Sequence, residues 1–548
     1  MDITVMLWSQ SASLPILTLL TLLPLAAMIA ILVADRPKLN VLFALLGILA
    51  TGLLSSYLLL AYDPENTGIQ LAEHVQFFGL SYYVGVDGAN VLFIPLTTVL
   101  TFLSFIYLQS TRYATDSAVL ACLLGYETIL LGAFSALNAL QFWLWCAVEI
   151  FPVAFLTLYT GTGNHRQQAV KILAQFWSGG LLLTLLGFLL LGFGLENTDE
   201  PLSFDWLTLA QNEAPFTNET LIFILLMYGF AIRMPLFPFH AWLPLLAEQG
   251  TVASTGVFII GLKLGIYAVI RFVLPLLPGV AEEWSGLVVV MGLIGLFYGA
   301  ILALMQNNIR RLLAFAAISH TGILILGIFS FDINGVEGSL LLSLAYGLSS
   351  AGLLFSIGFM YEHTQTTFMP RLGGLLDSHT AIGLLFLISA LSAMAIPGTP
   401  GFDAAHMLIE GIVEKNGWII ALLMGLGNLL AAAFLLWAFQ RIFLADSRRS
   451  IKVNHGSQSS THEWLITLII SGLLLTTGFY SAPWHALIDT ATGTIGKYYD
   501  FHNTIYNDDL INNSVDPKEM SAPAPEDNQK TEPTGDDNAV DNENTQHE

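Results

Sequence analysis

The chain has 548 residues, of which 55% are hydrophobic and only 11% charged, and its mean hydropathy is +0.67. A soluble domain carries about 25% charged residues, so this composition excludes a soluble globular protein and predicts a membrane protein. With a formal net charge of −22, we expect no nucleic-acid partner. The two cysteines, Cys122 and Cys146, lie in apolar stretches and are too few for a disulfide framework or a metal site, so we expect reduced core thiols.

Fourteen apolar runs follow one another along the chain, each near the ~20 residues that a membrane-spanning helix requires. The start, MDITVMLWSQSASLPILTLL, has no basic region and no small-residue cleavage site, so we expect an uncleaved first span rather than a signal peptide. The sequence therefore predicts an all-α polytopic membrane protein with about 14 transmembrane helices. The runs lie near residues 14–34, 40–62, 89–109, 117–136, 138–160, 171–194, 221–245, 252–275, 285–305, 309–330, 337–360, 381–411, 416–444 and 462–482.

The loops between the runs differ in charge. Those after even-numbered runs, such as LENTDEPLSFDW and PGVAEEW, are acidic, and Lys415 is the only basic residue among them. Loops rich in lysine and arginine stay in the cytoplasm, so we expect a bacterial inner-membrane protein with both termini on the periplasmic side. The loops after odd-numbered runs carry most of the basic residues, namely Arg36, Lys38, Arg112, Arg166, Lys171, Arg310, Arg311, Arg371, Arg441, Arg448, Arg449 and Lys452.

Paired prolines interrupt two of the runs. Pro235 and Pro238 lie in the seventh, and Pro397 and Pro400 in the twelfth. Proline removes a backbone N–H and clashes with the preceding turn, which frees carbonyl groups. Corresponding broken helices in two halves are typical of an internal repeat with an ion site at each break, and a five-helix unit repeated once is inverted in the membrane. Two unrelated proline kinks are the alternative.

This repeat divides the chain into five predicted parts. A disordered tail is expected at the end, because its 12 acidic and two basic residues accompany few apolar ones. The tail is either a solvated end or a docking arm for a basic partner. The parts are 1–110 (helices 1–3), 117–275 (first repeat, helices 4–8), 285–445 (second repeat, helices 9–13), 446–506 (last helix and an interfacial segment) and 507–548 (the tail).

Three charged residues, Glu149, Arg233 and Lys263, lie inside apolar runs. An ionisable group at membrane depth costs roughly 2.5–3.5 kcal/mol even on lenient scales and usually marks an ion or proton path. The sequence shows no cysteine cluster, nucleotide-binding loop or haem signature, so we expect no cofactor and no metal in this chain. His165, His240, His363, His455 and His462 lie near the ends of runs, and we expect them to be surface or interfacial residues.

Several long motifs carry a family resemblance. RRLLAFAAISHTG (310–322), followed by AYGLSSAGLLFSIGFMYEHTQTTFMPRLGGL (345–375), resembles the antiporter-like chain M of bacterial NADH–quinone oxidoreductase, complex I. FFGLSYYVGVDGANVLF, VEIFPVAFL, RMPLFPFHAWLP and GLKLGIYAVIRF are similar to other landmarks of that chain, in the same order. The likeness covers roughly residues 80–445. The wider family includes Mrp-type cation/proton antiporter subunits, membrane-bound hydrogenases and DabB-type subunits of inorganic-carbon pumps.

The resemblance implies 14 helices with two inverted five-helix repeats and a chain of charged residues along the membrane midplane. Glu149 matches the glutamate of the fifth span, Lys263 the lysine of the eighth and His320 the histidine of the tenth. Arg233 falls where the family usually has lysine, and arginine does not release its proton. Tyr346 falls where chain M usually has histidine.

The twelfth span departs further from the family. Ala405 occupies the usual glutamate position, so we expect Asp403 or His406 to act in its place, with Glu410 as an accessory group. Glu127, in LLGYETILL, is an additional acid that chain M does not usually carry.

Each residue has a structural alternative. Glu149 and Arg233, if ~4 Å apart at an effective dielectric of ~20, attract by about 4 kcal/mol, and opening that pair would change the field on Lys263. The pair is alternatively a static link between helices, and Lys263 alternatively snorkels to an interface. His320 is alternatively a hydrogen-bonded core histidine. Asp403 and His406 alternatively cap a broken helix, and Glu127 alternatively sits at the edge of its span.

Three functions stay open. The first is a proton-translocating membrane subunit of a complex I-like assembly, with other membrane subunits and membrane lipid around it. The second is a DabB-type subunit of an inorganic-carbon pump, driven by the proton gradient and paired with a soluble carbonic-anhydrase-like zinc protein. The third is a scaffold without conduction. The sequence shows no redox or hydrolytic site, so the chain is at most a translocase subunit of the NADH–quinone oxidoreductase type.

Overall fold

The computed structural model describes residues 5–66, 68–77, 80–194, 202–212, 216–250, 261–446 and 459–495. These residues are mostly helical, as predicted. Contacts separate the chain into Met1–Phe501 and His502–Glu548. The predicted tail, the predicted loop residues Arg448, Arg449 and Lys452, and His455 lie outside the described residues.

The first half of the chain contains eleven labelled helices, which include both halves of the seventh predicted span. They are α1 (Trp8–Ser11), α2 (Ile16–Ala34), α3 (Pro37–Ala61), α4 (Phe93–Gln109), α5 (Ser117–Ser135), α6 (Ala139–Val148), α7 (Ile150–Thr160), α8 (Arg166–Phe193), α9 (Trp206–Ala210), α10 (Glu219–Arg233) and α11 (Trp242–Gln249). Residues 261–268 are helical and continue into the π-helix η1 (Val269–Val273).

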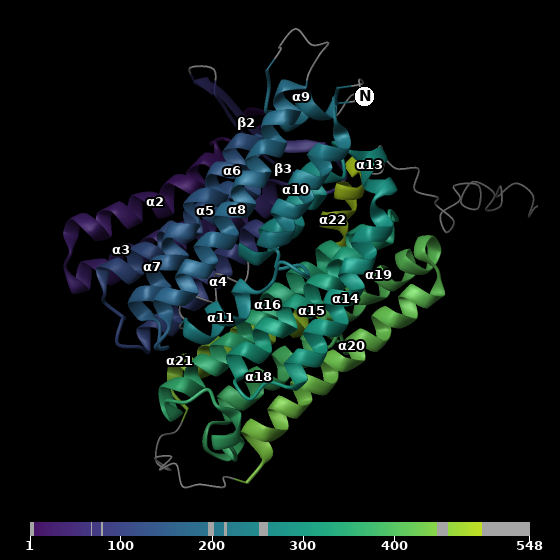
Figure 1. Ribbon diagram of the computed structural model, residues 1–548. Coiled ribbons are helices and arrows are strands. Elements are labelled where there is room, and N and C mark those ends of the chain that lie inside the picture. The colour runs from purple at the N-terminus through teal and green to yellow at the C-terminus, as the bar shows by residue number, and fades with distance from the viewer. Residues whose placement is uncertain are drawn as a thin grey trace, which may run out of the picture. The chain divides into compact units, whose positions relative to one another are not determined.

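The second half contains the twelfth predicted span, again in two pieces, and a C-terminal amphipathic helix. Its elements are α13 (Pro278–Glu283), α14 (Ser285–Leu304), α15 (Ile309–Ile328), α16 (Ile333–Thr364), the 3-10 helix η2 (Met369–Arg371), α17 (Leu375–Ser378), α18 (Thr380–Ala393), α19 (Pro400–Asn416), α20 (Trp418–Phe439), the π-helix η3 (Gln440–Leu444), α21 (Thr461–Phe479) and α22 (Ala482–Ile495). In Figure 1, α14, α15, α16 and α19 lie together, and α14 packs on α15 and α16 on α19.

Ten helical stretches in the described ranges are long and apolar enough to cross a membrane, and α4 and α18 are shorter apolar helices. All fourteen predicted runs contain helical residues. The count of 14 spans and the inverted relation of the two repeats stay predictions.

Both proline breaks are present. α10 ends at Arg233, two residues before Pro235, and the helix resumes only at Trp242. α18 ends at Ala393, and Pro400 occupies the first turn of α19, where its missing N–H costs nothing. The broken segments leave short non-helical stretches between buried helices, which is where irregular backbone is tolerated at membrane depth.

A three-stranded sheet is an addition to the predicted all-helical fold. β1 (Val5–Leu7) pairs in parallel with β2 (Ile69–Phe77), which pairs antiparallel with β3 (Leu80–Val86). The acidic segment DPENTGIQLAEHV follows the second predicted run, and the sequence predicts it only as a loop between two apolar runs. In the structure Glu73 is buried, and one of its carboxylate oxygens accepts a hydrogen bond of 2.8 Å from the backbone N–H of Leu17 in the first turn of α2.

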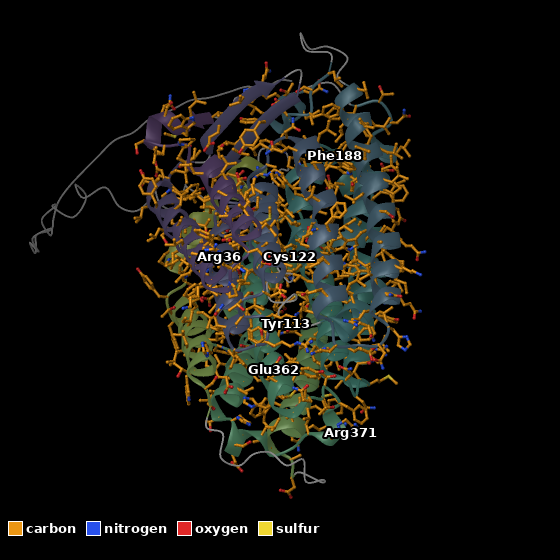
Figure 2. All side chains as sticks on the ribbon, turned by 90° about the vertical axis from the view of Figure 1, so that its left-hand side faces the viewer. Arg36, Tyr113, Cys122, Phe188, Glu362 and Arg371 are labelled. Carbon is orange, nitrogen blue, oxygen red and sulfur yellow. The ribbon has the colours of Figure 1, made fainter. Side chains whose placement is uncertain are left out.

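The basic loops and the sheet lie at opposite ends of the helices. Figure 2 places Arg371 and Glu362 at the end away from the strands, and Phe188 toward the strands. This arrangement agrees with the charge asymmetry of the loops, since Arg371 belongs to a basic loop and the sheet contains an acidic one.

Candidate functional site

Glu149 lies at the junction of α6 and α7, as the single residue between the end of α6 at Val148 and the start of α7 at Ile150. Its side chain is completely buried and receives a hydrogen bond of 2.7 Å from the Tyr126 hydroxyl on α5. An unpaired carboxylate at such a position is costly, so the site requires a cation.

Arg233, the last residue of α10, supplies that cation. Its Nη2 forms an ion pair with Glu149 Oε2, and its guanidinium lies 4.5 Å from the ring centre of Trp177. Nη2 also lies 3.4 Å from the carbonyl oxygen of Gly261, to which it donates a long hydrogen bond. The arginine therefore connects the break in the seventh span to the segment that carries Lys263.

Gly261 permits this close approach. A Cβ at this position would overlap both the Tyr126 hydroxyl and Glu149 Oε1. A larger residue would therefore push the Tyr126 hydroxyl or the Glu149 carboxylate out of its place.

Lys263 is buried, and its Nζ lies 5.7 Å from the centre of the Tyr346 ring. That ring stacks on His320, with centroids 4.0 Å apart and an interplanar angle of 8°. The ring face attracts the lysine cation. Burial rules out snorkelling of Lys263, and His320 Nε2 has no hydrogen-bond partner in the part of the chain that the structure describes. His320 is therefore not a fully hydrogen-bonded core histidine.

We call Glu149, Arg233, Lys263, Tyr346 and His320 the central string. It runs from the α6–α7 junction through the segment after residue 261 to α16 and α15, and so links the two predicted repeats. A small, partly open cavity of about 20 Å³ lies beside Arg233 and is lined by residues that include Trp177 and Leu264. It has room for about one water molecule.

The structure does not bring the residues of the twelfth span to this string. His406 and Glu410 form an ion pair of 3.3 Å on α19, with 68% and 45% of their side chains exposed. Asp403 is half-buried in the first turn of α19, where a carboxylate suits the positive end of the helix dipole. Ala405 faces inward and is buried. The expected interior group is thus missing at this break, where Asp403 is half-buried and His406 and Glu410 lie on the outer face.

Glu127 is an interior residue rather than one at the edge of its span. It lies in the middle of α5, fully buried, and one carboxylate oxygen accepts a hydrogen bond of 3.0 Å from the Thr51 hydroxyl of α3. The other oxygen has no hydrogen-bond partner among the described residues.

His240 was expected to be a surface or interfacial residue, and it does not lie on the surface. It is buried in the break after α10, stacked against Phe237 and edge-on to Tyr298. The paired prolines explain the error, because they fold the chain after Arg233 back into the protein instead of ending the span at its surface. His165 is exposed, and both cysteines are free thiols.

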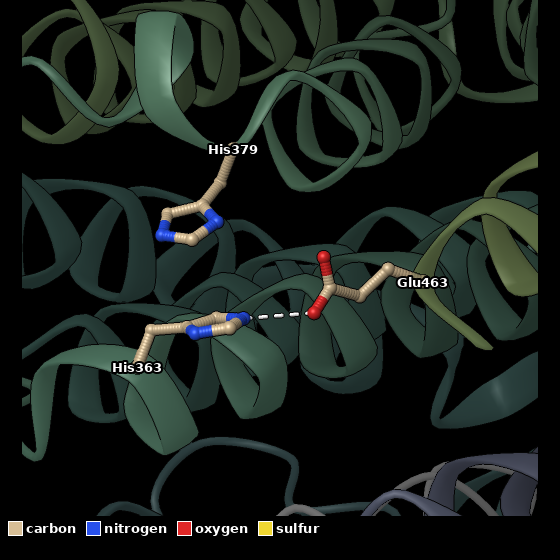
Figure 3. Close-up of side chains that lie close together, drawn as sticks. All are labelled: His363, His379 and Glu463. Carbon is tan, nitrogen blue, oxygen red and sulfur yellow. Dashed lines mark hydrogen bonds and ion pairs between the residues drawn. The ribbon is translucent and has the colours of Figure 1, made fainter. Parts of the chain in front are cut away.

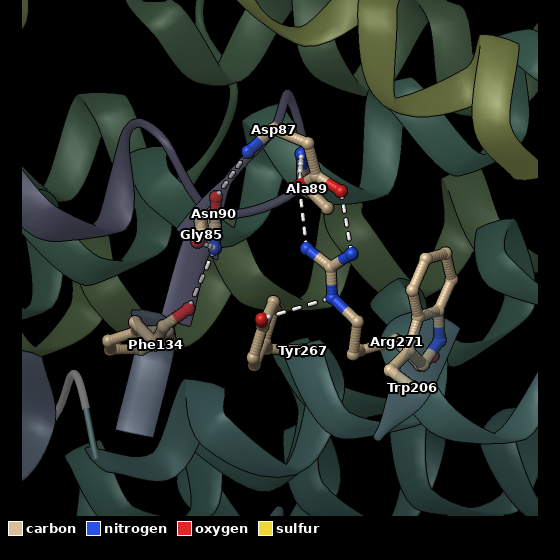
Figure 4. Close-up of polar contacts among 8 residues, drawn as sticks. All are labelled: Gly85, Asp87, Ala89, Asn90, Phe134, Trp206, Tyr267 and Arg271. Atoms are coloured by element: carbon tan, nitrogen blue, oxygen red, sulfur yellow. Dashed lines mark hydrogen bonds and ion pairs between the residues drawn. The ribbon is translucent and has the colours of Figure 1, made fainter. Parts of the chain in front are cut away.

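The sequence did not single out one further buried ion pair. Arg271 of η1 binds Asp87 through two hydrogen bonds of 2.6 Å and also donates to the Tyr267 hydroxyl at 3.1 Å (Figure 4). Trp206 donates to the Arg271 carbonyl at 2.6 Å. This bidentate pair fixes the end of the Lys263 segment to the loop after β3. Both residues lie in motifs that resemble chain M, which was the one signal in the sequence.

Comparison with known proteins gives the family. Residues 136–431 match the family described as NADH:quinone oxidoreductase/Mrp antiporter, TM. NADH-quinone oxidoreductase subunit M of Rhodobacter capsulatus is 29% identical over 505 residues, covering 88% of this chain and 97% of that protein. The corresponding protein of Rickettsia typhi is 29% identical over 448 residues, covering 79% and 89%.

Solved structures of membrane complexes contain chains with the same fold. A chain of respiratory complex I from Thermus thermophilus with bound NADH superposes with a TM-score of 0.77 at 27% identity, covering 88% of this chain and 100% of that chain. A chain of the Mrp complex from a Dietzia species has the same fold, with a TM-score of 0.77 at 20% identity, covering 88% and 98%. The chain therefore belongs to the NADH:quinone oxidoreductase/Mrp antiporter family of membrane proteins.

Proposed function

We propose that this chain is a proton-translocating, antiporter-like membrane subunit of a complex I-like assembly. Its family and its relatives named as subunit M support this function. The relatives favour it over the inorganic-carbon alternative and its carbonic-anhydrase-like partner. In the proposed function, redox chemistry takes place in partner chains, and this chain moves the proton.

One observation carries the mechanism. Arg233 bonds both to the Glu149 carboxylate and to the Gly261 carbonyl, two residues before Lys263. While the ion pair is closed, Glu149 neutralises the arginine charge. When the ion pair opens, the Arg233 charge is no longer neutralised and repels the Lys263 cation. At an effective dielectric of ~20 and a separation of ~8 Å, this repulsion is about 2 kcal/mol, which favours release of the Lys263 proton. His320 receives this proton past Tyr346 in the proposed path.

The exit of the path is proposed at Asp403 or His406, with Glu410 as the accessory group. Because His406 and Glu410 face outward on α19, a proton that reaches them leaves the chain through the outer face of this helix. A carboxylate that faces lipid is costly, so we propose that another membrane subunit covers this face. The fold is shared with chains of multi-subunit membrane complexes, which supports such partners.

The test uses the intact assembly. The chain is expressed with its chromosomal neighbours, the complex is purified through this chain, and proton translocation is measured in inverted membrane vesicles. Lys263→Ala should reduce translocation at least ~10-fold while the complex still assembles, since losing a buried charge relieves a burial cost. Lys415→Ala, which removes an exposed lysine that pairs with Glu282, is the matched control and should translocate normally. Normal translocation by Lys263→Ala would exclude the proposed path.

The proposed orientation places both termini outside the cytoplasm, in the bacterial inner membrane. A reporter that is active only after export should be active when it is fused after residue 510. Strong activity of a cytoplasmic reporter at the same position would overturn this orientation and the even number of spans.

A further inference from the structure

A second cluster of titratable side chains lies outside the central string. His363, near the end of α16, His379, between α17 and α18, and Glu463, in the first turn of α21, meet at one point (Figure 3). One nitrogen of each histidine and one oxygen of the carboxylate all lie within 4.8 Å of one another. Three separate elements therefore present three metal-ligand side chains to a common centre.

Two of the three groups already interact. His363 Nε2 lies 2.8 Å from Glu463 Oε1, and the His363 and His379 rings stack with centroids 4.1 Å apart. The other carboxylate oxygen accepts a hydrogen bond of 3.2 Å from the backbone N–H of Ser460, as part of the capping box of α21. The capping box fixes the carboxylate in the way that outer-shell contacts orient metal ligands.

His379 is the group that this hydrogen bonding leaves unexplained. It is 2% exposed, and its Nδ1 has no hydrogen-bond partner among the described residues. In Figure 3 a nitrogen of its ring lies on the side of the Glu463 carboxylate. Buried polar atoms are rarely left unpaired, so a purely structural His363–Glu463 pair accounts for two groups and not the third.

We propose that His363, His379 and Glu463 form a binding site for a divalent transition-metal ion, with Zn²⁺ as the best-fitting ion. Two imidazoles and one carboxylate are ligands that Zn²⁺ accepts, whereas Ca²⁺ and Mg²⁺ prefer oxygen ligands alone. Ligands at 2.0–2.2 Å in a tetrahedral site lie about 3.4 Å apart. Binding would therefore lengthen the 2.8 Å separation of His363 Nε2 and Glu463 Oε1 and shorten any separation near the 4.8 Å limit. The ion replaces the His363–Glu463 hydrogen bond and links the ends of α16, α18 and α21.

The test measures Zn²⁺ on the full-length chain. The protein is purified in detergent through a tag without histidine, treated with EDTA, dialysed against buffered Zn²⁺ and analysed for bound metal and for its unfolding temperature. We expect one Zn²⁺ per wild-type chain and a Zn²⁺-dependent rise in that temperature. His379→Ala and Glu463→Gln should each weaken binding by more than about 100-fold, since even outer-shell changes cost 10–100-fold. His462→Ala, adjacent to Glu463 but outside the cluster, should bind like wild type.

Two outcomes would overturn the proposal. The first is equal Zn²⁺ content in wild type and His379→Ala, which would reduce the cluster to a hydrogen-bonded pair. The second comes from Co²⁺ added to the wild-type chain, which does not depend on variants that fold poorly. Four-coordinate Co²⁺ gives intense visible absorption, so the weak spectrum of six-coordinate Co²⁺ would contradict the site.

Discussion

A pair of ionisable side chains lies near each of the two proline breaks, but one pair is buried and the other is exposed. Near the first, Glu149 and Arg233 form an ion pair with 0% and 9% of their side chains exposed, enclosed by Tyr126 and Trp177. On the helix after the second, His406 and Glu410 form a pair that is 68% and 45% exposed. A buried pair resists separation and strongly affects nearby charges, whereas an exposed pair does neither until something covers it. The first break therefore has the means to act within this chain, and the second depends on a neighbour.

Removing one partner of the buried pair should have the largest effect. Glu149→Gln or Arg233→Met leaves an uncompensated group in a low dielectric and should lower the free energy of unfolding by roughly 3–5 kcal/mol. The double variant should be more stable than either single one yet should not translocate protons. Thermal unfolding in detergent, together with vesicle assays of the complex, measures both. Additive effects of the two changes would mean that the pair is not coupled.

Crowding at Gly261 should have the next largest effect. Gly261→Ala places a methyl group against Tyr126 and Glu149 and should destabilise the chain by about 1–3 kcal/mol, with a loss of translocation. Gly179→Ala on α8 is the matched control, because nothing lies within 4 Å of its added Cβ. Similar unfolding temperatures for the two variants would show that the packing around Glu149 is looser than described.

Changes in the exposed pair, His406 and Glu410, should have little effect on the stability of the isolated chain. Glu410→Gln should change the stability of the isolated chain by less than about 1 kcal/mol, because exposed ion pairs contribute little. In the intact assembly, Asp403→Asn and His406→Ala should reduce translocation, singly or together. If both are silent there while Glu149→Gln is not, the exit does not run through α19.

Replacing the arginine cation at position 233 by a lysine cation should have the smallest effect on translocation. Arg233→Lys introduces the residue that the resemblance to chain M implies at this position, and a lysine cation satisfies Glu149 equally in charge. We expect translocation within about twofold of wild type in the vesicle assay. A loss comparable to that of Glu149→Gln would show that the bond from Arg233 to the Gly261 carbonyl is indispensable.

Patterns along the sequence predict the parts of the fold that depend on local chemistry. Apolar runs predict the helices, and Pro235 and Pro400 predict the breaks, because each acts through its own backbone. The sheet does not follow from such local patterns, since Glu73 is buried only by bonding to α2, far away in sequence. The burial of His240 does not follow from them either, because it depends on how the chain folds back after the break.

The residues of the candidate site also fall into those that local sequence identifies and those that depend on packing. Charge inside an apolar run is enough to identify Glu149, Arg233 and Lys263, because burial of such a group requires a reason. The direction in which a helix turns its side chains depends on packing, so nothing local distinguishes the inward Glu127 from the outward His406. The His363–His379–Glu463 cluster combines three elements and becomes visible only in three dimensions.

The most direct test of the central string replaces Lys263 by arginine. Lys263→Arg keeps the positive charge next to Tyr346 and so preserves the electrostatics of a purely structural lysine, but arginine does not release a proton. Proton translocation by the intact assembly in inverted vesicles, normalised to assembled complex, should fall to the level of Lys263→Ala. Near-normal translocation by Lys263→Arg would contradict the account, because Lys263 would then not carry the proton.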